Sequence, residues 1–168
     1  MLYGKFYNSP IGKILIVCDE SSLIGLWFDN QKYYKNDINE EIIFKNNEII
    51  NEVSLFLDNY FKGSSKQVIN FKLNPKGTNF QKKVWNILLD INYGEIKTYK
   101  EICEEYKKRN NVDNMSYRAI GSAISKNPIS IIIPCHRVIG KNNKLVGYAG
   151  GVDRKKYLLD LERKYKLS

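Results

Sequence analysis

The chain has 168 residues, of which 27 are Lys or Arg and 18 are Asp or Glu, so its formal net charge is +9. A composition of 43% apolar and 27% charged residues is typical of folded proteins and excludes a largely disordered chain. No apolar run approaches the roughly 20 residues of a membrane helix. The N-terminus has no signal-peptide pattern, so we expect a cytoplasmic protein without membrane contact. The positive charge favours a polyanionic partner.

The first part of the chain predicts short strands joined by tight turns. The strands are expected at residues 5–7, 13–18 and 23–28, with turns at 9–12 and 19–22. The polar segment 30–48 indicates a surface helix or a loop. Apolar residues then recur at helical spacing over 49–61, and 68–71 is a further candidate strand. We expect residues 1–73 to form a small α+β domain.

Residues 74–168 predict a second, mostly helical domain. Thr78 and Gln81 form a capping box before a helix that is expected to end near residues 93–95. A second capping box at Thr98 opens a helix to about Arg109. The apolar face of the first helix is expected to hold Phe80, Val84, Trp85, Leu88 and Leu89.

A polar loop is expected over residues 107–114, followed by a short helix that Ser116 caps and Asn127 stops. Two short helices joined by a turn indicate a helix-turn-helix, and the alternative is a pair of ordinary core helices. The positive net charge favours the helix-turn-helix.

The three cysteines, Cys18, Cys103 and Cys135, are expected to be free thiols in a reducing compartment. They show no CxxC spacing, and His136 is the only histidine, so we expect no metal site.

Residues 131–137, with the sequence Ile-Ile-Ile-Pro-Cys-His-Arg, carry the strongest chemical signal. The apolar run predicts a buried strand that delivers Cys135 to a fixed position. A cysteine becomes a nucleophile when its surroundings stabilise the thiolate, and His136 and Arg137 follow it directly. The alternative is an inert cysteine, because free cysteine is among the most buried residue types.

The Pro-Cys-His-Arg segment resembles the active-site signature of the O6-alkylguanine-DNA alkyltransferases. Other segments similar to the family are, in order, residues 9–12, 80–85, 91–95, 98–99, 118–121, 126–128 and 147–151. The resemblance implies an α+β fold, in which a ribonuclease H-like N-terminal domain precedes a winged-helix-like C-terminal domain with a helix-turn-helix. It implies no cofactor, and we expect a monomer.

The resemblance also implies DNA repair by direct reversal of damage. An alkyl group of O6-alkylguanine or O4-alkylthymine in double-stranded DNA would pass irreversibly to Cys135, once per molecule, after base flipping. His136 would deprotonate Cys135 through a water, and Glu162 would orient His136. Tyr99 would supply a proton near N3 of the guanine and crowd the backbone phosphate. Asn127 would tie the turn beneath the thiol.

Arg118 matches the finger that fills the gap left by the flipped base, and its helix would lie in the minor groove. Readout there is degenerate, which suits repair in any sequence. The expected DNA-binding residues are Tyr99, Ser116, Arg118, Ala119, Gly121, Ser122 and Ala123. The expected pocket for the base and its alkyl group consists of Pro134, Val138, Tyr148, Ala149 and Gly150.

Three features depart from the family pattern. The segment from Tyr99 to Arg118 is several residues longer, and the basic residues 107–109 at the extra loop would add phosphate contact. Ser130 replaces a proline of some members, and Ala149 replaces a serine, so a roomier pocket is expected.

Two other classes of protein remain as alternatives. An alkyltransferase-like binding protein flips the base but has its cysteine replaced, whereas this chain keeps Cys135. A helix-turn-helix regulator would leave the Pro-Cys-His-Arg segment unexplained. A regulator fused to a repair domain would need a cysteine-rich zinc domain, for which three cysteines are too few.

Overall fold

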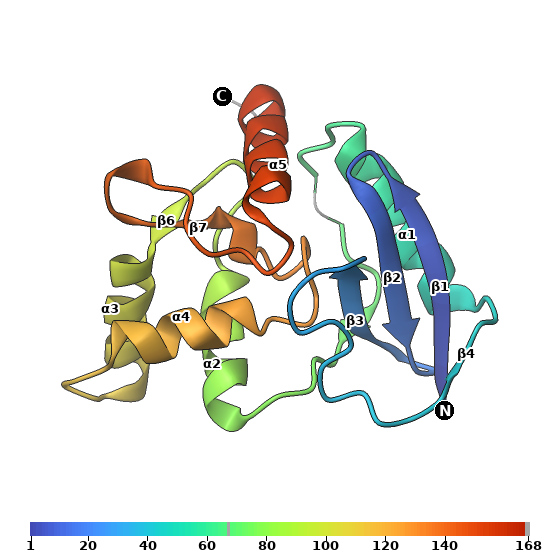
Figure 1. Ribbon diagram of the computed structural model, residues 1–168, viewed down its shortest axis with the longest axis horizontal. Coiled ribbons are helices and arrows are strands. Elements are labelled where there is room, and N and C mark those ends of the chain that lie inside the picture. The colour runs from blue at the N-terminus through green and yellow to red at the C-terminus, as the bar shows by residue number, and fades with distance from the viewer. Residues whose placement is uncertain (67, 167–168) are drawn as a thin grey trace.

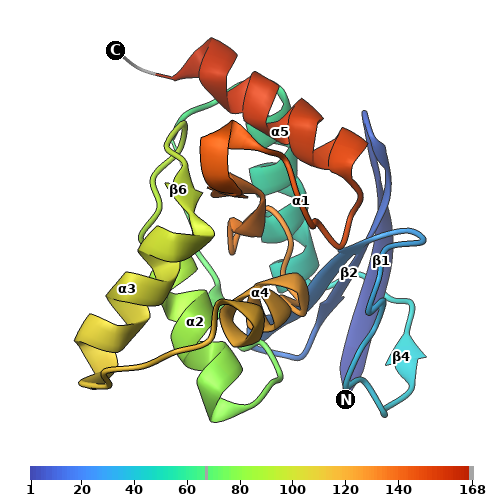
Figure 2. The ribbon, with the colours of Figure 1, turned by 60° about the vertical axis from the view of Figure 1, so that its left-hand side comes forward.

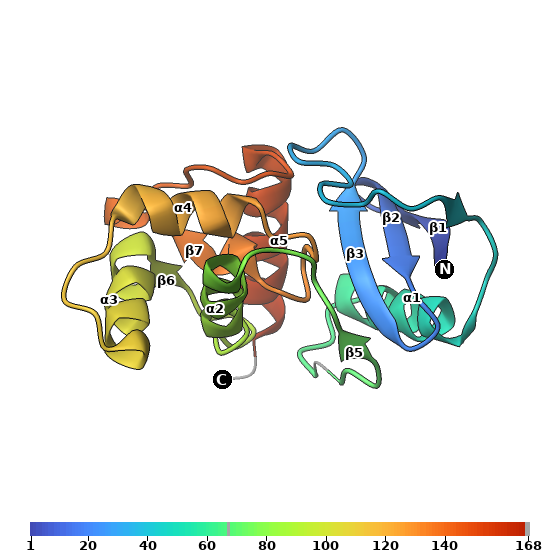
Figure 3. The same cartoon turned by 90° about the horizontal axis from the view of Figure 1, so that it is seen from below.

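The structure is a computed structural model that describes residues 1–66 and 68–166. It has the predicted α+β architecture, with a sheet and one helix on one side and four further helices on the other (Figure 1). We call β1–β5 with α1 the sheet half, and α2–α5 with the segments between them the helical half. Figure 3 shows the two halves side by side.

The sheet half is built on the predicted hairpin and third strand. Strand β2 alternates between two apolar environments, because Ile14 and Ile16 share a core with α1 whereas Leu15 and Val17 pack with Trp27 on the opposite face. The sheet order is β4-β1-β2-β3-β5. The elements are β1 (Leu2–Ser9), β2 (Gly12–Cys18), β3 (Ser22–Phe28), β4 (Ile42–Ile43), α1 (Glu48–Phe61) and β5 (Lys72–Leu73).

One prediction for this half is confirmed and another is wrong. The segment 30–48 is the loop that was one of its two expected forms, with turns and the short strand β4 before α1. The predicted strand at 68–71 is wrong, because Val68 and Ile69 are exposed and the chain reaches the edge of β3 only at Lys72 and Leu73. Residue 67 lies outside the described residues.

The helical half begins with the two predicted capping boxes, and both are present at Thr78 and Thr98. The predicted apolar face of α2 is wrong at Leu89, which is exposed beyond the end of the helix, while Ile87 is buried in its place. The elements are α2 (Asn79–Leu88), β6 (Lys97–Thr98), α3 (Tyr99–Asn110), α4 (Tyr117–Ser125), the 3-10 turn η1 (Cys135–Arg137), β7 (Val138–Ile139), the 3-10 turn η2 (Lys141–Asn143) and α5 (Val152–Tyr165).

Helix α3 ends at Asn110, as predicted to within one residue, so the expected loop at 107–114 is wrong in its first part. The helix includes Lys107 to Asn110 and ends at Asn111 in the left-handed conformation (φ 56°), which Asn tolerates better than most residues. Only the remaining residues up to Ser116 connect α3 to α4, and Ser116 caps α4 as predicted, its side chain accepting from the amide of Ala119.

The two halves share one apolar core, and a short segment joins their backbones. The Leu26 amide donates to the Pro128 carbonyl at 2.7 Å, and the Ser130 amide donates to the Leu26 carbonyl at 2.9 Å. The segment just before residues 131–137 is therefore fixed on the edge of β3. Within the described residues, no helix is long and apolar enough to span a membrane.

Candidate active site at Cys135

The apolar residues 131–133 are buried as predicted, but the predicted strand is wrong. After the bridge between Leu26 and Ile129 the chain turns, and Ile131 adopts a positive φ of 72°. The Ile133 amide donates to the Ile129 carbonyl, and the Cys135 amide donates to the Ile133 carbonyl at 2.8 Å. A tight apolar turn, followed by η1, therefore presents the thiol.

Asn127 fixes the Cys135 thiol from below. Its Nδ2 donates to the Ile133 carbonyl at 2.8 Å and to Cys135 Sγ at 3.2 Å, while its Oδ1 accepts from the Ile129 amide at 2.9 Å. Only 5% of Cys135 is exposed, and burial raises the pKa of its thiol. The Asn127 hydrogen bond and the positive charge of Lys155 act in the opposite direction. The thiol thus needs a base to ionise.

Glu162 of α5 is the centre of a buried network beside Cys135. It receives five hydrogen bonds from four residues, namely His136 Nε2 to Oε2 at 2.5 Å, Arg137 Nε to Oε1 at 2.7 Å, Arg137 Nη2 to Oε2 at 3.2 Å, the Gly94 amide to Oε1 at 3.1 Å and the Tyr60 hydroxyl to Oε2 at 2.6 Å. Burial alone would raise the pKa of Glu162, but the charges and hydrogen bonds of His136 and Arg137 outweigh it and hold the pKa well below its usual range.

The ionised Glu162 decides which nitrogen of His136 carries the proton. A carboxylate can only accept, so Nε2 of His136 must be the donor, and the lone pair of the neutral ring is left on Nδ1. Burial lowers the pKa of His136, which favours the neutral ring. Nδ1 is buried and has no hydrogen-bond partner among the described residues. The neutral ring can therefore accept a proton on Nδ1. The thiol of the preceding residue, Cys135, is the candidate donor of that proton.

Tyr99, at the first turn of α3, lies over the loop that precedes α5. Its hydroxyl donates to the carbonyls of Val146 and Gly147 at 3.1 and 3.2 Å. Burial, with a smaller effect of Cys135, raises the pKa of Tyr99 to about 12, so the phenol stays protonated at neutral pH. A hollow of about 570 Å³ lies beside it, lined by Thr98, Tyr99, Lys100, Tyr117, Gly140, Lys141 and Asn142.

The expected pocket residues lie on both sides of Cys135 in the sequence, and two of them are held by the sheet half. Tyr148 is buried with its ring edge-on to Phe28 of β3, and the Ala149 carbonyl accepts from the Lys32 amide at 3.0 Å. A Cβ on Gly150 would come within 2.6 Å of the Tyr148 ring, so glycine is required there for close packing. Pro134 and Val138 are buried at the two ends of η1.

Lys155 is a buried residue of this site that the sequence analysis did not single out. Its Nζ donates to the carbonyls of Val138 at 2.5 Å and Val146 at 3.1 Å, and burial lowers its pKa to about 8. A signal was available, because the side chains at positions 155, 158, 159 and 162 share one buried face of α5 at helical spacing. A lysine on that face needs partners inside the protein.

Helix α4 exposes most, but not all, of the residues expected to meet DNA. Ser116, Arg118 and Ser122 are exposed, Ala119 and Gly121 are partly exposed, and a Cβ built on Gly121 meets no atom within 4 Å. The expectation for Ala123 is wrong, because its side chain is 2% exposed and its carbonyl accepts from Trp85 Nε1 at 2.8 Å. Ala123 packs against α2.

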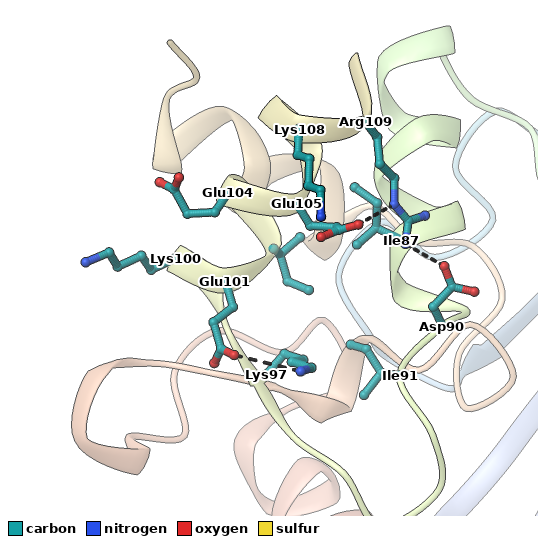
Figure 4. Close-up of a pocket in the computed structure, with 11 residues that line it drawn as sticks. Ile87, Asp90, Ile91, Lys97, Lys100, Glu101, Glu104, Glu105, Lys108 and Arg109 are labelled. Carbon is teal, nitrogen blue, oxygen red and sulfur yellow. Dashed lines mark hydrogen bonds and ion pairs between the residues drawn. The ribbon is translucent and has the colours of Figure 1, made fainter. Parts of the chain in front are cut away.

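A second hollow, of about 670 Å³, lies away from Cys135, between the end of α2 and the outer face of α3 (Figure 4). Arg109 forms ion pairs there with Glu105 at 2.8 Å and Asp90 at 2.6 Å, drawn as dashed lines in Figure 4. Lys107, which the figure does not draw, forms an ion pair with Glu104 at 2.9 Å. Lys107 and Arg109 are thus paired with acidic neighbours, and the phosphate contact expected of residues 107–109 stays a prediction. No cluster of metal ligands occurs among the residues described.

The fold and the site together define a class of protein, in which a helical half with α3 followed by α4 carries a buried cysteine beside a histidine–glutamate pair. The family model described as the 6-O-methylguanine DNA methyltransferase DNA binding domain matches residues 79–164, and the model of the ribonuclease-like domain matches residues 2–75. The chain belongs to the O6-methylguanine DNA methyltransferase family.

Relatives and solved structures are similar over nearly the full chain. A methylated-DNA–protein-cysteine methyltransferase of Methanosarcina acetivorans is 45% identical, over 96% of this chain and 98% of that protein. The protein of the same name in Haemophilus influenzae is 38% identical, over 96% and 87%. The crystal structure of Mycobacterium tuberculosis OGT in complex with DNA superposes with a TM-score of 0.83 at 34% identity, over 97% of this chain and 94% of that one.

Proposed function

We propose that this chain repairs alkylated double-stranded DNA by moving the alkyl group from O6 of guanine, or O4 of thymine, irreversibly to Cys135. The arrangement of Cys135, His136 and Glu162 carries the proposal, because it pairs a buried thiol with a histidine whose protonated nitrogen is fixed by a carboxylate. The relatives named for this activity, and the structure of one with DNA, support it.

The proposed chemistry is a single displacement. His136 takes the thiol proton on Nδ1, through a water as the family resemblance implies, and the thiolate attacks the alkyl carbon. The C–S bond forms as the bond between that carbon and O6 breaks, and its electron pair passes into the guanine ring. Tyr99 protonates the ring, and the proton on His136 then replaces the one that Tyr99 gave. The products are guanine and S-alkyl Cys135, and no cofactor takes part.

The DNA would lie along the exposed face of α4. The target base must leave the stack to reach a thiol this deeply buried, and Arg118 would occupy the gap. Lys100 and Lys141 flank the hollow beside Tyr99, which suits a phosphate backbone passing close to the flipped nucleotide. We propose a boundary between domains 1–73 and 74–168, and action in the cytoplasm.

Intact-mass measurement tests the proposal. The chain is incubated with a duplex that carries O6-methylguanine, and a mass gain of one CH₂ group is expected on the peptide that contains Cys135. Cys135→Ala should show no gain while binding the duplex about as tightly, because the thiol contributes chemistry and little contact area. Methyl transfer to Cys18 or Cys103 would contradict the site assignment. Binding without transfer by the unaltered chain would favour the alkyltransferase-like alternative.

A further inference from the structure

We propose that Tyr60, which α1 of the sheet half contributes, is a positioning residue for the reaction at Cys135 and acts through Glu162 and His136. This inference rests on the function proposed above. It gives the sheet half a direct part in the chemistry of a thiol that lies in the helical half.

The geometry places Tyr60 inside the active-site network. The residue is 1% exposed, and its hydroxyl donates to Glu162 Oε2 at 2.6 Å across 102 positions of sequence. The same oxygen accepts from His136 Nε2. Figure 2 shows α5, which carries Glu162, passing beside α1. One carboxylate oxygen therefore links the histidine of one half to the tyrosine of the other.

The hydroxyl has a chemical consequence for His136. Burial, with the charge of Glu162, raises the pKa of Tyr60 well above its ordinary value, so Tyr60 stays a neutral donor at any pH of interest. A neutral donor on Oε2 stabilises the carboxylate and lowers its basicity toward the imidazole. Without that donor, Glu162 would bind the protonated ring of His136 more strongly and raise its pKa.

The hydroxyl also fixes the carboxylate in space. Arg137 and the Gly94 amide hold Oε1 from one side, whereas Tyr60 approaches Oε2 from the sheet half. Loss of the hydroxyl leaves Oε2 with fewer fixed donors, so His136 would be oriented less tightly toward the thiol. Besides Tyr60, the titratable or charged groups near Glu162 and His136 are Cys135, Arg137, Lys155, Tyr93 and Tyr148.

The chain offers a matched control for removal of the hydroxyl. The ring of Tyr93 packs edge-on against that of Tyr60, at 6.2 Å between centroids, and its buried hydroxyl has no hydrogen-bond partner within the described part of the chain. Tyr93→Phe and Tyr60→Phe thus make the same chemical change in the same aromatic cluster. Only the second removes a hydrogen bond to Glu162.

The first measurement follows the titration of His136 by NMR in the free full-length protein. The chain has one histidine, so its imidazole signals need no assignment by mutation. Tyr60→Phe should raise the titration midpoint by about half a pH unit, since one neutral donor leaves the carboxylate. Tyr93→Phe should leave the midpoint where it is. This result involves no DNA, so it stands or falls independently of the proposed function.

The second measurement is the rate of methyl transfer from an O6-methylguanine duplex as a function of pH. Tyr60→Phe should slow transfer about tenfold at neutral pH, as expected for loss of an orienting partner, and should move the acid limb of the profile upward with the His136 midpoint. Tyr93→Phe should match the unaltered protein in both respects.

Three results would overturn the inference. Equal midpoints and rates in the two variants would show that the Tyr60 hydroxyl does not act on His136. A fall in thermal stability without a change in midpoint would make Tyr60 a structural residue only, and so would failure of Tyr60→Phe alone to fold. A different result separates the two proposals. If the unaltered chain transfers no methyl group but Tyr60→Phe still shifts the His136 titration midpoint, the proposed function is wrong and the effect of Tyr60 on His136 through Glu162 is retained.

Discussion

Gly121 offers a test of the DNA-binding face in which stability and binding should change in opposite directions. Glycine in a helix interior costs about 1 kcal/mol relative to alanine. Gly121 lies in the middle of α4, and a Cβ built there meets no protein atom within 4 Å. Nothing within the described protein requires glycine at this position, so we expect that it serves close approach of a partner.

Gly121→Ala should therefore stabilise the free protein by up to about 1 kcal/mol, because the added methyl group improves helix propensity without a clash. For a chain of this size that corresponds to a rise in Tm of about 2–4 °C. The same methyl group would project into the minor groove and should weaken binding of a lesion duplex. Thermal melts and fluorescence anisotropy with a labelled duplex measure the two effects separately.

Asn59→Ala on α1 is the control, because it improves helix propensity at an exposed position of the sheet half. It should raise Tm without changing DNA affinity. If Gly121→Ala binds the duplex as tightly as the unaltered chain, the exposed face of α4 is not the contact surface. If it lowers Tm, the argument from open space around Gly121 is wrong.

Three further predictions follow from the site. Arg118→Ala should slow repair of duplex lesions far more than reaction with free O6-benzylguanine, and equal losses on both substrates would assign Arg118 to the pocket. Alkylation of Cys135 should overpack its surroundings and lower the free energy of unfolding by about 1–3 kcal/mol. Methylated protein, and especially benzylated protein, should therefore melt at a lower temperature than unmodified protein, whereas identical melts would indicate an open pocket. Burial lowers the pKa of His136 in the native chain. As the pH falls below about 6.5, the unfolded chain therefore binds a proton at His136 while the native chain does not, and the free energy of unfolding decreases. Melts from pH 7.5 to 5.5 should show that loss in the unaltered chain and a smaller one in His136→Phe.

Local sequence patterns predicted the parts of this fold that local forces determine. The capping boxes at Thr78 and Thr98 satisfy helix-end amides within four residues, so their sequence signature is sufficient. The turn at 131–134 could not be predicted in this way, because a run of isoleucines is equally typical of a buried strand. Its shape depends on the anchoring of Ile129 against Leu26, a contact between distant segments.

The candidate site likewise combines residues that local sequence identifies with residues that depend on contacts between distant segments. Cys135 and His136 are adjacent in the sequence and were identifiable there, as was Arg118 through the family resemblance. The expectation that Ala123 contacts DNA follows from its place on the helix that carries Arg118, but the position of α2 decides which side of α4 is buried. The part of Tyr60 in the network depends on contact between α1 and α5, which no local pattern encodes.

The five hydrogen bonds on Glu162 have a consequence for the newly made protein. All of their donors, from Tyr60 to Arg137, precede Glu162 in the chain, so each is synthesised before its acceptor. Until Glu162 is made, no carboxylate fixes the proton on His136, so the network beside the thiol of Cys135 is incomplete. The network that connects the two halves of the fold is therefore completed only by α5, the last helix of the chain.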